Sequence, residues 1–253
     1  MIHFDVDGRL AVITLDRPDA RNAINAAMAD GIERALDRLE DDDDLWAGIL
    51  THRGPAFCAG ADLKEIAAGN TSKLWTERGG FGGIVLRERT KPLIAAVDGH
   101  AVAGGTEIAL ACDLRVASTE SVFGIPEVKR SLVAAAGGLV RLPRVLPPAI
   151  AMELALTGDT ITADRAHHFG MLNAVCAPGD ALATAKALAD RVLANAPLAV
   201  QATRRLVLDA PQQSDREGMR AASEAMAALS STADYAEGPR AFIEKRPPRW
   251  TGT

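Results

Sequence analysis

Two glycine-containing turns and two nearby carboxylates are the part of the sequence best suited to chemistry. In "AVDGHAVAGGTEIALACDLRVAS" (96–118), an apolar stretch leads to the pair Gly104–Gly105, which opens a segment typical of a helix. Glu107 lies in the first turn of that predicted helix. A second turn, "CAGAD" (58–62), follows another apolar stretch. Small residues let a ligand approach the backbone closely, and a helix N-terminus presents N–H groups without partners in the helix.

Two such turns would form an oxyanion hole if they converged. Each would offer one backbone N–H to a negative charge developing on an acyl oxygen, and such a donor is typically worth roughly 3–4 kcal/mol. Glu107 would lie beside the hole, although a carboxylate in a first helical turn also commonly complements the helix dipole. The second candidate is Glu127 in "FGIPEVKR" (123–130), which taken alone would be an exposed charge at the end of an apolar strand.

Together, Glu107 and Glu127 predict acid–base chemistry on a bound water molecule. One carboxylate would take a proton from the water while the other delivers one. Their mutual repulsion in a partly dry cleft should separate their pKa values and leave one of them protonated. No other catalytic arrangement competes well, because GxSxG and the phosphate-loop motifs are absent and Cys58 has no obvious base.

Composition and charge favour a protein that acts on a small molecule. The 253 residues suffice for one large domain, or for a core with a smaller appendage. The net charge of −5 comes without a basic patch, which argues against nucleic acid as the main partner. No segment resembles a secretory leader or approaches membrane length, so we expect a cytoplasmic protein without a membrane partner.

Cysteine and histidine spacing predicts neither disulfides nor a metal site. Cys58, Cys112 and Cys176 are too few and too scattered for a disulfide framework. No Cys/His spacing suggests zinc, and the five histidines form no ligand set. We therefore expect no metal and no redox cofactor.

Strands and helices are predicted to alternate along the first half of the chain. Apolar segments at 46–54 and 91–99 predict buried strands, each followed by a glycine turn and a helix, and residues 25–40 predict an amphipathic helix. The N-terminal segment predicts a hairpin that turns at Asp7–Gly8. Weak periodicity and many glycines at 68–83 indicate a loop or mobile cover.

The second half of the chain is predicted to be mostly helical. Short strands are expected at "DLRVAS" and "SVFGIPEV", and from Pro148 onward the last hundred or so residues have an almost wholly helical pattern. The sequence therefore predicts an α/β core with an α-helical tail.

Three segments together resemble core signatures of the crotonase superfamily, and of its enoyl-CoA hydratases in particular. They are "FCAGADLKE", "DGHAVAGGTEIALACDLRVAS" and "FGIPEV", and the similarity extends nearly end to end, from "LDRPDARNAIN" to "EGPRAFIEKRPPRW". The resemblance implies a crotonase (ClpP-like) α/β spiral of ββα turns at 1–195. It also implies a C-terminal helical region at 196–253 that drives assembly of a homotrimer, usually as a dimer of trimers. The implied substrate is an acyl-CoA thioester, with coenzyme A present only as part of the substrate.

The resemblance also implies roles for individual residues. The N–H groups of Ala61 and Gly104 match the oxyanion hole, while Glu107 and Glu127 match the two catalytic glutamates of hydratases. In the implied hydration, Glu107 mainly activates the water and Glu127 mainly delivers the α-proton. Contacts to coenzyme A are implied for Arg21, Ala23, Ala59, Asp62 and Lys64, and, from a neighbouring subunit at the adenine nucleotide, for Phe242 and Lys245.

Other segments resemble the carnitinyl-CoA dehydratase branch, which hydrates crotonobetainyl-CoA. They are "ERGGFGGI" (77–84), "RLPRVLPPAI" (141–150) and the C-terminal ending. Substrate choice in the superfamily lies in a variable loop, here about 66–90. Its Trp75 and Phe81 are candidates for the wall of the acyl pocket, and plain packing is the alternative.

One departure from the hydratase pattern follows Glu127. Ser131, Ala134 and Ala135 stand where the pattern has glycine, proline and then glycine or aspartate. Because alanine restricts the backbone and adds a methyl group, water placement or acyl fit could differ from an ordinary hydratase. Three alternatives to an enoyl-CoA hydratase therefore stay open: a carnitinyl-CoA dehydratase, a Δ3-Δ2 enoyl-CoA isomerase that needs one carboxylate, and a non-catalytic acyl-CoA-binding relative.

Overall fold

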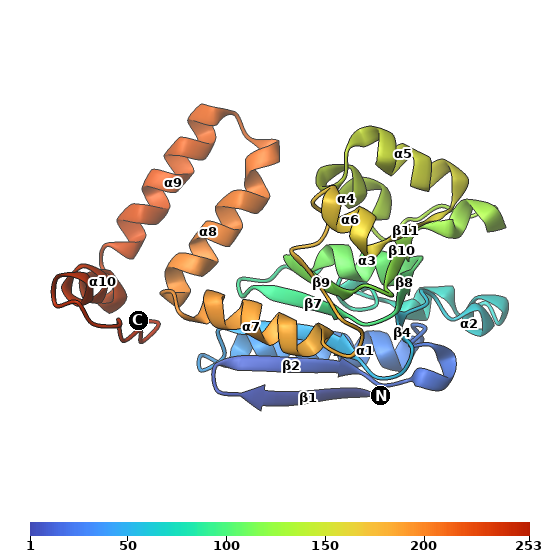
Figure 1. Cartoon of the computed structure of the whole chain (residues 1–253), viewed down its shortest axis with the longest axis horizontal. Coiled ribbons are helices and arrows are strands. Elements are labelled where there is room, and N and C mark those ends of the chain that lie inside the picture. Colours follow the sequence, from blue (N-terminus) through green and yellow to red (C-terminus); the bar gives the residue numbers. More distant parts are fainter.

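A six-stranded sheet forms the centre of the computed structural model, which describes residues 1–253 (Figure 1). In sheet order its strands are β1 (Ile2–Asp7), β2 (Leu10–Leu15), β3 (Ala47–His52), β7 (Leu93–Val97), β9 (Leu114–Ser118) and β12 (Ala174–Cys176). The β1–β2 pair is an antiparallel hairpin and all other neighbours are parallel. A parallel sheet of this kind needs crossover connections, which here pass through a second sheet and the helices.

The second sheet has four short strands. Their order is β11 (Thr160–Thr162), β10 (Val122–Gly124), β8 (His100–Val102) and β4 (Ala56–Cys58). Along the chain, each of β3, β7 and β9 in the first sheet is followed by β4, β8 or β10 in the second sheet and then by a helical segment. This repeated ββα order is the predicted spiral, and it brings the ends of β4, β8 and β10 to one side of the molecule.

Helices cover both faces of the central sheet. Helix α1 (Ala26–Asp41) begins where the Asn25 side chain accepts a hydrogen bond from the Met28 N–H, and it buries Ile32 and Leu36 against the core. On the other face, α7 (Ala181–Leu193) buries three alanines at four-residue spacing against β3, β7 and β9. The predicted helix at 25–40 is confirmed, and burial on both faces explains the continuous apolar runs of β3 and β7.

The remaining helices surround the ends of the strands or lie away from the sheets. They are η1 (Pro18–Ala20), α2 (Leu63–Ala67), η2 (Thr71–Leu74), α3 (Gly104–Ala111), η3 (Pro126–Arg130), α4 (Gly138–Val145), α5 (Pro148–Thr157), α6 (Ala163–His168), α8 (Pro197–Asp209), η4 (Ala210–Gln212), α9 (Asp215–Leu229) and α10 (Ala233–Ile243). Figure 1 shows α8, α9 and α10 extending beyond the sheets, on the side away from α2. None of the helices combines the length and the apolar character needed to cross a bilayer.

Several predicted elements differ from the structure in detail. The hairpin turns at Gly8–Arg9 rather than Asp7–Gly8, because Asp7 still pairs with Leu10. The helical second half also contains β11 and β12, two strands too short to show a periodicity of their own. Residues 123–130 form a strand that passes directly into the 3₁₀ helix η3, so Glu127 lies in a helical turn and not at a strand end.

The segment predicted as a loop or mobile cover is a small folded unit. It contains η2 and the two-stranded hairpin of β5 (Trp75–Thr76) and β6 (Gly80–Phe81). The Glu33 carboxylate on α1 accepts a hydrogen bond from the Gly79 N–H at 2.8 Å, and Arg78 forms an ion pair with Asp37 at 2.7 Å. The hairpin is therefore anchored to α1.

Candidate active site

The two glycine turns meet in the structure. A Cβ added to Gly60 would lie 3.0 Å from the Gly104 nitrogen, and a Cβ added to Gly105 would lie 2.0 Å from the Cys58 carbonyl oxygen. The backbone of 58–61 is thus in direct contact with the start of α3. Only residues without a side chain allow this approach, which explains the consecutive glycines and confirms the predicted convergence.

The backbone hydrogen bonds on either side of Ala61 do not use the N–H of Ala61 itself. The Ile24 N–H donates to the Gly60 carbonyl at 2.7 Å, and the Asp62 N–H donates to the Ile24 carbonyl at 2.9 Å. Gly104 is the first residue of α3, so its N–H has no acceptor within the helix. The two N–H groups predicted to stabilise an oxyanion therefore come from adjoining backbone segments.

The junction between β8 and α3 is strained and firmly held. Ala103 has φ +53° and ψ −130°, a conformation that costs of order 1–3 kcal/mol for a residue with a side chain. Its N–H donates to the Gly124 carbonyl at 2.8 Å. The buried Thr106 hydroxyl accepts from the Gly124 N–H at 2.9 Å and lies 2.7 Å from the Ala101 carbonyl. These bonds to β8 and β10 fix the direction of the peptide that leads into Gly104.

Glu107 is buried, with 3% of its surface exposed. Its Oε1 accepts a hydrogen bond from the Gly138 N–H at 2.8 Å. Burial raises the pKa of Glu107, and so does the charge of Glu127, while the Gly138 N–H and the Arg141 charge lower it; the net pKa is about 7. A carboxyl group with this pKa can gain or lose a proton near neutral pH.

Glu127 lies half-buried in η3, and its Oε2 is buried without a hydrogen-bond partner. Burial raises the pKa of Glu127 above its ordinary value, against the opposing charge of Arg130. A buried carboxylate oxygen normally has a partner, so an unpartnered one is suited to bind a water or a substrate atom.

Burial also raises the pKa of the Cys58 thiol to about 12, which keeps this thiol protonated and unreactive.

Five of the residues implied to contact coenzyme A lie on two adjoining segments. The Ala59 N–H donates to the Arg21 carbonyl at 3.0 Å, so residues 21–24 run beside residues 59–62. Arg21 and Lys64 are exposed, and neither forms an ion pair in the chain. Ala23 lies buried on the same segment as Arg21.

The Asp62 carboxylate is committed to the protein itself. It forms an ion pair with Arg17 at 2.7 Å and accepts a hydrogen bond from the Lys64 N–H at 2.9 Å, which starts α2. Arg17 also donates to the Ala23 carbonyl at 2.9 Å and so joins both segments. Sequence analysis missed Arg17, although "LDRPDARNAIN" contains it. The Asp62 side chain supports this part of the site, and its contact with coenzyme A stays a prediction.

A sequence model described as enoyl-CoA hydratase/isomerase matches residues 5–253. The chain belongs to this family. The enoyl-CoA hydratase EchA19 of Mycobacterium tuberculosis is 40% identical over 96% of this chain and 93% of its own length. The carnitinyl-CoA dehydratase of Salmonella arizonae is 39% identical over 97% of this chain and 96% of its own length. These matches confirm the resemblance to both branches.

Solved structures of the family share the fold over the whole chain. The crystal structure of an enoyl-CoA hydratase from Mycobacterium tuberculosis H37Rv superposes with a TM-score of 0.96 at 49% identity, covering 100% of this chain and 99% of that one. The predicted crotonase spiral of ββα turns with C-terminal helices is therefore confirmed. The division at residue 195, between α7 and α8, stays a prediction.

Within this family fold, Phe81 lies at the oxyanion turn. A Cβ added to Gly104 would lie 2.4 Å from the Phe81 ring. Phe81 is buried, with 4% of its surface exposed. Trp75 pairs with Phe81 across the hairpin, their ring centroids 5.8 Å apart, and remains 38% exposed. Phe81 thus borders the turn predicted to bind the thioester oxygen, and Trp75 is the more exposed ring of the pair.

Phe242 and Lys245 are not brought to the site within one chain. Phe242 is 85% exposed on α10, and Figure 1 shows α10 on the opposite side of the molecule from α2 and β4. The implied contact with the adenine nucleotide would therefore need a second copy of the chain.

Of the residues that depart from the hydratase pattern, two alanines fit their backbone positions and Ser131 is in a strained one. Ser131 has φ +57°, a conformation that favours glycine, and it ends η3 four residues after Glu127. Ala134 and Ala135 do not have positive φ, so alanine fits there without this strain. Ala134 is buried beside the turn that leads to Gly138, whereas Ala135 is exposed.

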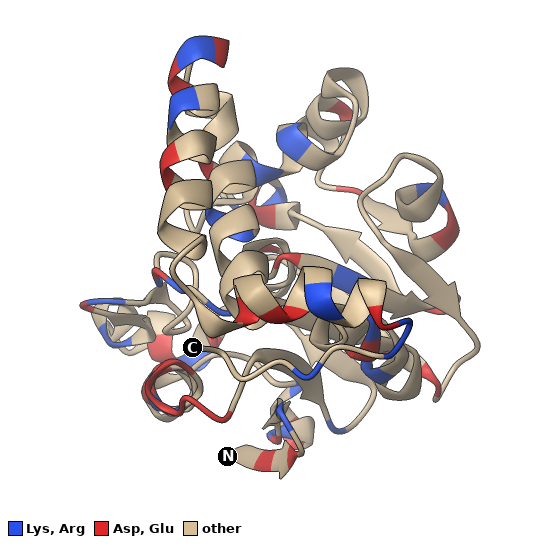
Figure 2. Cartoon of the chain, turned by 90° about the vertical axis from the view of Figure 1, so that its left-hand side faces the viewer, with Lys and Arg blue, Asp and Glu red and all other residues tan.

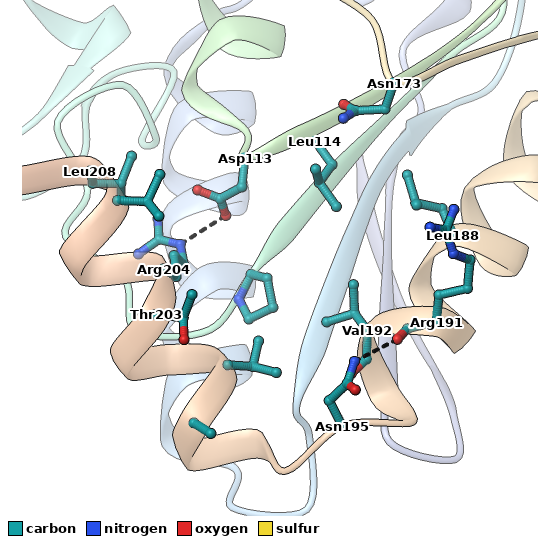
Figure 3. A pocket seen from close by; sticks show the side chains of 14 residues that line it. Asp113, Leu114, Asn173, Leu188, Arg191, Val192, Asn195, Thr203, Arg204 and Leu208 are labelled. Atoms are coloured by element: carbon teal, nitrogen blue, oxygen red, sulfur yellow. Dashed lines mark hydrogen bonds and ion pairs between the residues drawn. The ribbon is translucent and has the colours of Figure 1, made fainter. Parts of the chain in front are cut away.

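A separate cavity of about 840 Å³ lies between α7, α8 and the starts of β7 and β9 (Figure 3). Neither Glu107 nor Glu127 lines it. Its Asp113 carboxylate is already occupied by Arg204 at 2.9 Å, Arg89 at 3.2 Å and the Leu93 N–H at 2.8 Å. These interactions fasten α8 to the sheet. The cavity is therefore a gap between structural elements and not the candidate active site. No group of three histidine, cysteine or acidic side chains could hold a metal ion.

The buried Glu107 carboxyl makes stability depend on pH. Because its pKa in the folded protein is about 7 and its ordinary value is 4.5, the folded state binds this proton more tightly than the unfolded state. Stability is therefore lost as the pH rises through the interval between these two values. We expect Glu107→Gln to raise the free energy of unfolding by about 1–3 kcal/mol at about pH 8 and to have little effect at about pH 4.

Urea denaturation at the two pH values measures this difference. The glutamine side chain keeps an oxygen that can accept the Gly138 N–H, so the comparison isolates the charge. An equal gain at both pH values, or no gain at the higher one, would contradict the ionisation argument.

Proposed function

We propose that the protein is an enoyl-CoA hydratase, a hydro-lyase that adds water across the double bond of a 2-enoyl-CoA thioester. In the reverse direction it would dehydrate a 3-hydroxyacyl-CoA. The observation that carries the proposal is a pair of interacting carboxyl groups of raised pKa, Glu107 and Glu127. Glu107 lies in the first turn of α3, whose first residue, Gly104, adjoins the backbone that leads to Ala61. The names of the most similar relatives support the same reaction.

The proposed mechanism follows from the charge that develops on the thioester. The N–H groups of Ala61 and Gly104 bind the thioester oxygen and stabilise the enolate-like charge. Glu107 takes a proton from a water molecule while the water oxygen bonds to the β-carbon, and Glu127 gives its own proton to the α-carbon. A proton then returns from Glu107 to Glu127 before the next turnover.

Coenzyme A enters this reaction as part of the substrate, and we propose that no cofactor takes part. Addition of water is redox-neutral, and the two backbone donors supply the charge stabilisation that a Lewis acid would otherwise provide. The exposed cations of Arg21 and Lys64 are suited to the phosphates of the nucleotide. Nucleic acid is not a proposed partner, because positive and negative segments are interspersed along the helices (Figure 2).

We propose that the working form is a homotrimer or a dimer of trimers. Helix α9 has no buried residue in the single chain, and large apolar side chains such as Met219, Met226 and Phe242 are exposed on α9 and α10. Burial between copies would remove this apolar surface from water and bring Phe242 and Lys245 to a neighbour's nucleotide. Sedimentation equilibrium should then give three or six times the 26.6 kDa chain mass.

We also propose a cytoplasmic location. The free thiols of Cys58, Cys112 and Cys176 support it, since a reducing compartment keeps cysteines unpaired.

The second candidate function is carnitinyl-CoA dehydratase. The 39% identity to the Salmonella arizonae enzyme favours it, as does the aromatic pair of Trp75 and Phe81, which could face a quaternary ammonium group. Crotonyl-CoA and crotonobetainyl-CoA should therefore be compared side by side by the loss of enoyl-thioester absorbance in the ultraviolet.

Each outcome of this comparison assigns a function. Fast loss with crotonyl-CoA supports the hydratase, and fast loss with crotonobetainyl-CoA alone supports the second candidate. If neither absorbance falls, a 3-enoyl-CoA is supplied: growth of 2-enoyl absorbance would identify the isomerase. Tight binding of all three esters without reaction would identify a non-catalytic acyl-CoA-binding protein and overturn the proposal.

A further inference from the structure

Two consecutive glycines at the start of α4 accommodate groups of opposite charge. Gly137 has φ +100°, and a Cβ there would lie 2.0 Å from Nη1 of Arg141. Gly138 donates its N–H to Glu107, and a Cβ there would lie 3.0 Å from the same carboxylate oxygen. The guanidinium and the carboxylate therefore lie against neighbouring peptide units.

Arg141 has no carboxylate partner, although it is half-buried. Its Nη2 donates to the Val85 carbonyl at 2.5 Å, and its Nη1 lies 3.5 Å from the Ala136 carbonyl. Burial lowers the pKa of Arg141, yet a guanidinium stays charged in proteins. Holding an unpaired cation inside the protein is costly, so its position beside a reactive carboxyl calls for a role.

The two carbonyls that hold Arg141 belong to different parts of the site. Ala136 lies in the turn that presents the Gly138 N–H to Glu107. Val85 follows the β5–β6 hairpin, whose Phe81 borders the predicted oxyanion turn. One side chain thus connects the backbone that binds the carboxylate with the segment that would enclose the acyl group.

We propose that Arg141 is a positioning residue for the hydration reaction: it fixes the 136–138 turn that binds Glu107, fastens the acyl-pocket segment through Val85, and stabilises the ionised form of Glu107 by its charge. This inference rests on the proposed function. Arg141 need not touch the substrate, since it acts through Glu107 and through the pocket wall.

The charges around Glu107 set the direction of the expected effect. Glu127, on η3, disfavours ionisation of Glu107. The N–H groups of Gly138 and Ala136, and the charge of Arg141, favour it. Removing the Arg141 charge therefore raises the pKa of Glu107 above about 7.

Arg141 itself is faced by Arg144 on its own helix and by Arg89, both of which repel it, and by Glu107 and the Cys112 thiol. Arg144 is exposed and does not appear among the groups that act on Glu107. It therefore offers a matched control on the same helix.

The test compares Arg141→Gln, Arg141→Lys and Arg144→Gln in hydration kinetics across pH. For Arg141→Gln we expect the acid-side midpoint of kcat/KM to rise by about half a pH unit and kcat at neutral pH to fall about twofold. Arg141→Lys keeps the charge, so its midpoint returns toward the wild-type value while a raised KM remains from the altered Val85 contact. Arg144→Gln should match the wild type.

A second measurement needs no catalytic activity. The Glu107 carboxyl is titrated by ¹³C NMR in free protein labelled at glutamate Cδ, with its signal assigned by its loss in Glu107→Gln. An upward shift of its pKa in Arg141→Gln, absent in Arg144→Gln, supports the proposal even if the wild type hydrates no ester. In that case only the proposed function fails.

If the pKa of Glu107 is unchanged in Arg141→Gln, the proposal is overturned. A lowered melting temperature of the same variant would then show that Arg141 has only a structural role. If Arg141→Gln does not fold, Arg141→Met replaces it, because methionine removes the same charge and keeps a long side chain. Arg141→Met must then raise the midpoint for the proposal to stand.

Discussion

Glu127→Gln is expected to lower kcat for enoyl-thioester hydration by about 1,000-fold, with KM changed only a few-fold. The amide keeps the shape of the side chain but has no proton to give to the α-carbon. Because Oε2 of Glu127 is buried without a protein partner, the substitution breaks no hydrogen bond at that atom. Stopped-flow decay of the enoyl absorbance measures the effect.

Glu120→Gln is the matched control, since Glu120 is an exposed glutamate in the turn that precedes β10. It should retain full activity. If Glu127→Gln hydrates crotonyl-CoA at the wild-type rate, Glu127 is not the proton donor. If it loses hydration but still moves a double bond between positions 3 and 2, Glu107 alone serves as the isomerase base.

Gly105→Ala is expected to have the second-largest effect, lowering kcat about 100-fold or more through the oxyanion hole. The new Cβ would lie 2.0 Å from the Cys58 carbonyl oxygen, a backbone atom that no side-chain rotation can clear. The 58–61 turn must therefore move away from α3, which separates the N–H groups of Ala61 and Gly104. We also expect a loss of about 1–3 kcal/mol in the free energy of unfolding, as in overpacked cores.

Two further glycine variants make the interpretation specific. In Gly104→Ala the clash is with the end of the Phe81 ring, which can rotate, so stability should fall less than in Gly105→Ala. Gly218→Ala, in α9, meets only the Gln213 side chain at 3.7 Å and should be neutral or slightly stabilising. Full activity in Gly105→Ala would contradict the assignment of this contact to the oxyanion hole.

Sequence reasoning located the oxyanion turns because their requirement is local. A strand that ends in small residues and opens a helix leaves a recognisable pattern, and the glycines of α3 need no distant information. The partners of Glu107 could not be found in this way. Gly138 binds it, and Arg141 acts on it by its charge, from a helix more than thirty positions away, and only the folded spiral brings them together.

The hairpin at 75–81 shows why glycine content misled the sequence analysis. Many glycines suggested mobility, but several of them allow close packing. A Cβ on Gly83 would lie 2.3 Å from the Ala29 carbonyl oxygen of α1, and one on Gly79 would lie 2.2 Å from the Gly83 backbone. Composition does not distinguish a glycine that loosens the chain from one that lets two backbones touch.

The hydrogen bond from Ala103 to Gly124 has a consequence for the newly made protein. During synthesis both glycine turns leave the ribosome well before β10, yet the strained peptide at Ala103 is held only once Gly124 has paired beside it. The carboxylate of Glu107 then waits for Gly138. A nascent chain that ends before Gly138 therefore cannot assemble the site proposed for the thioester.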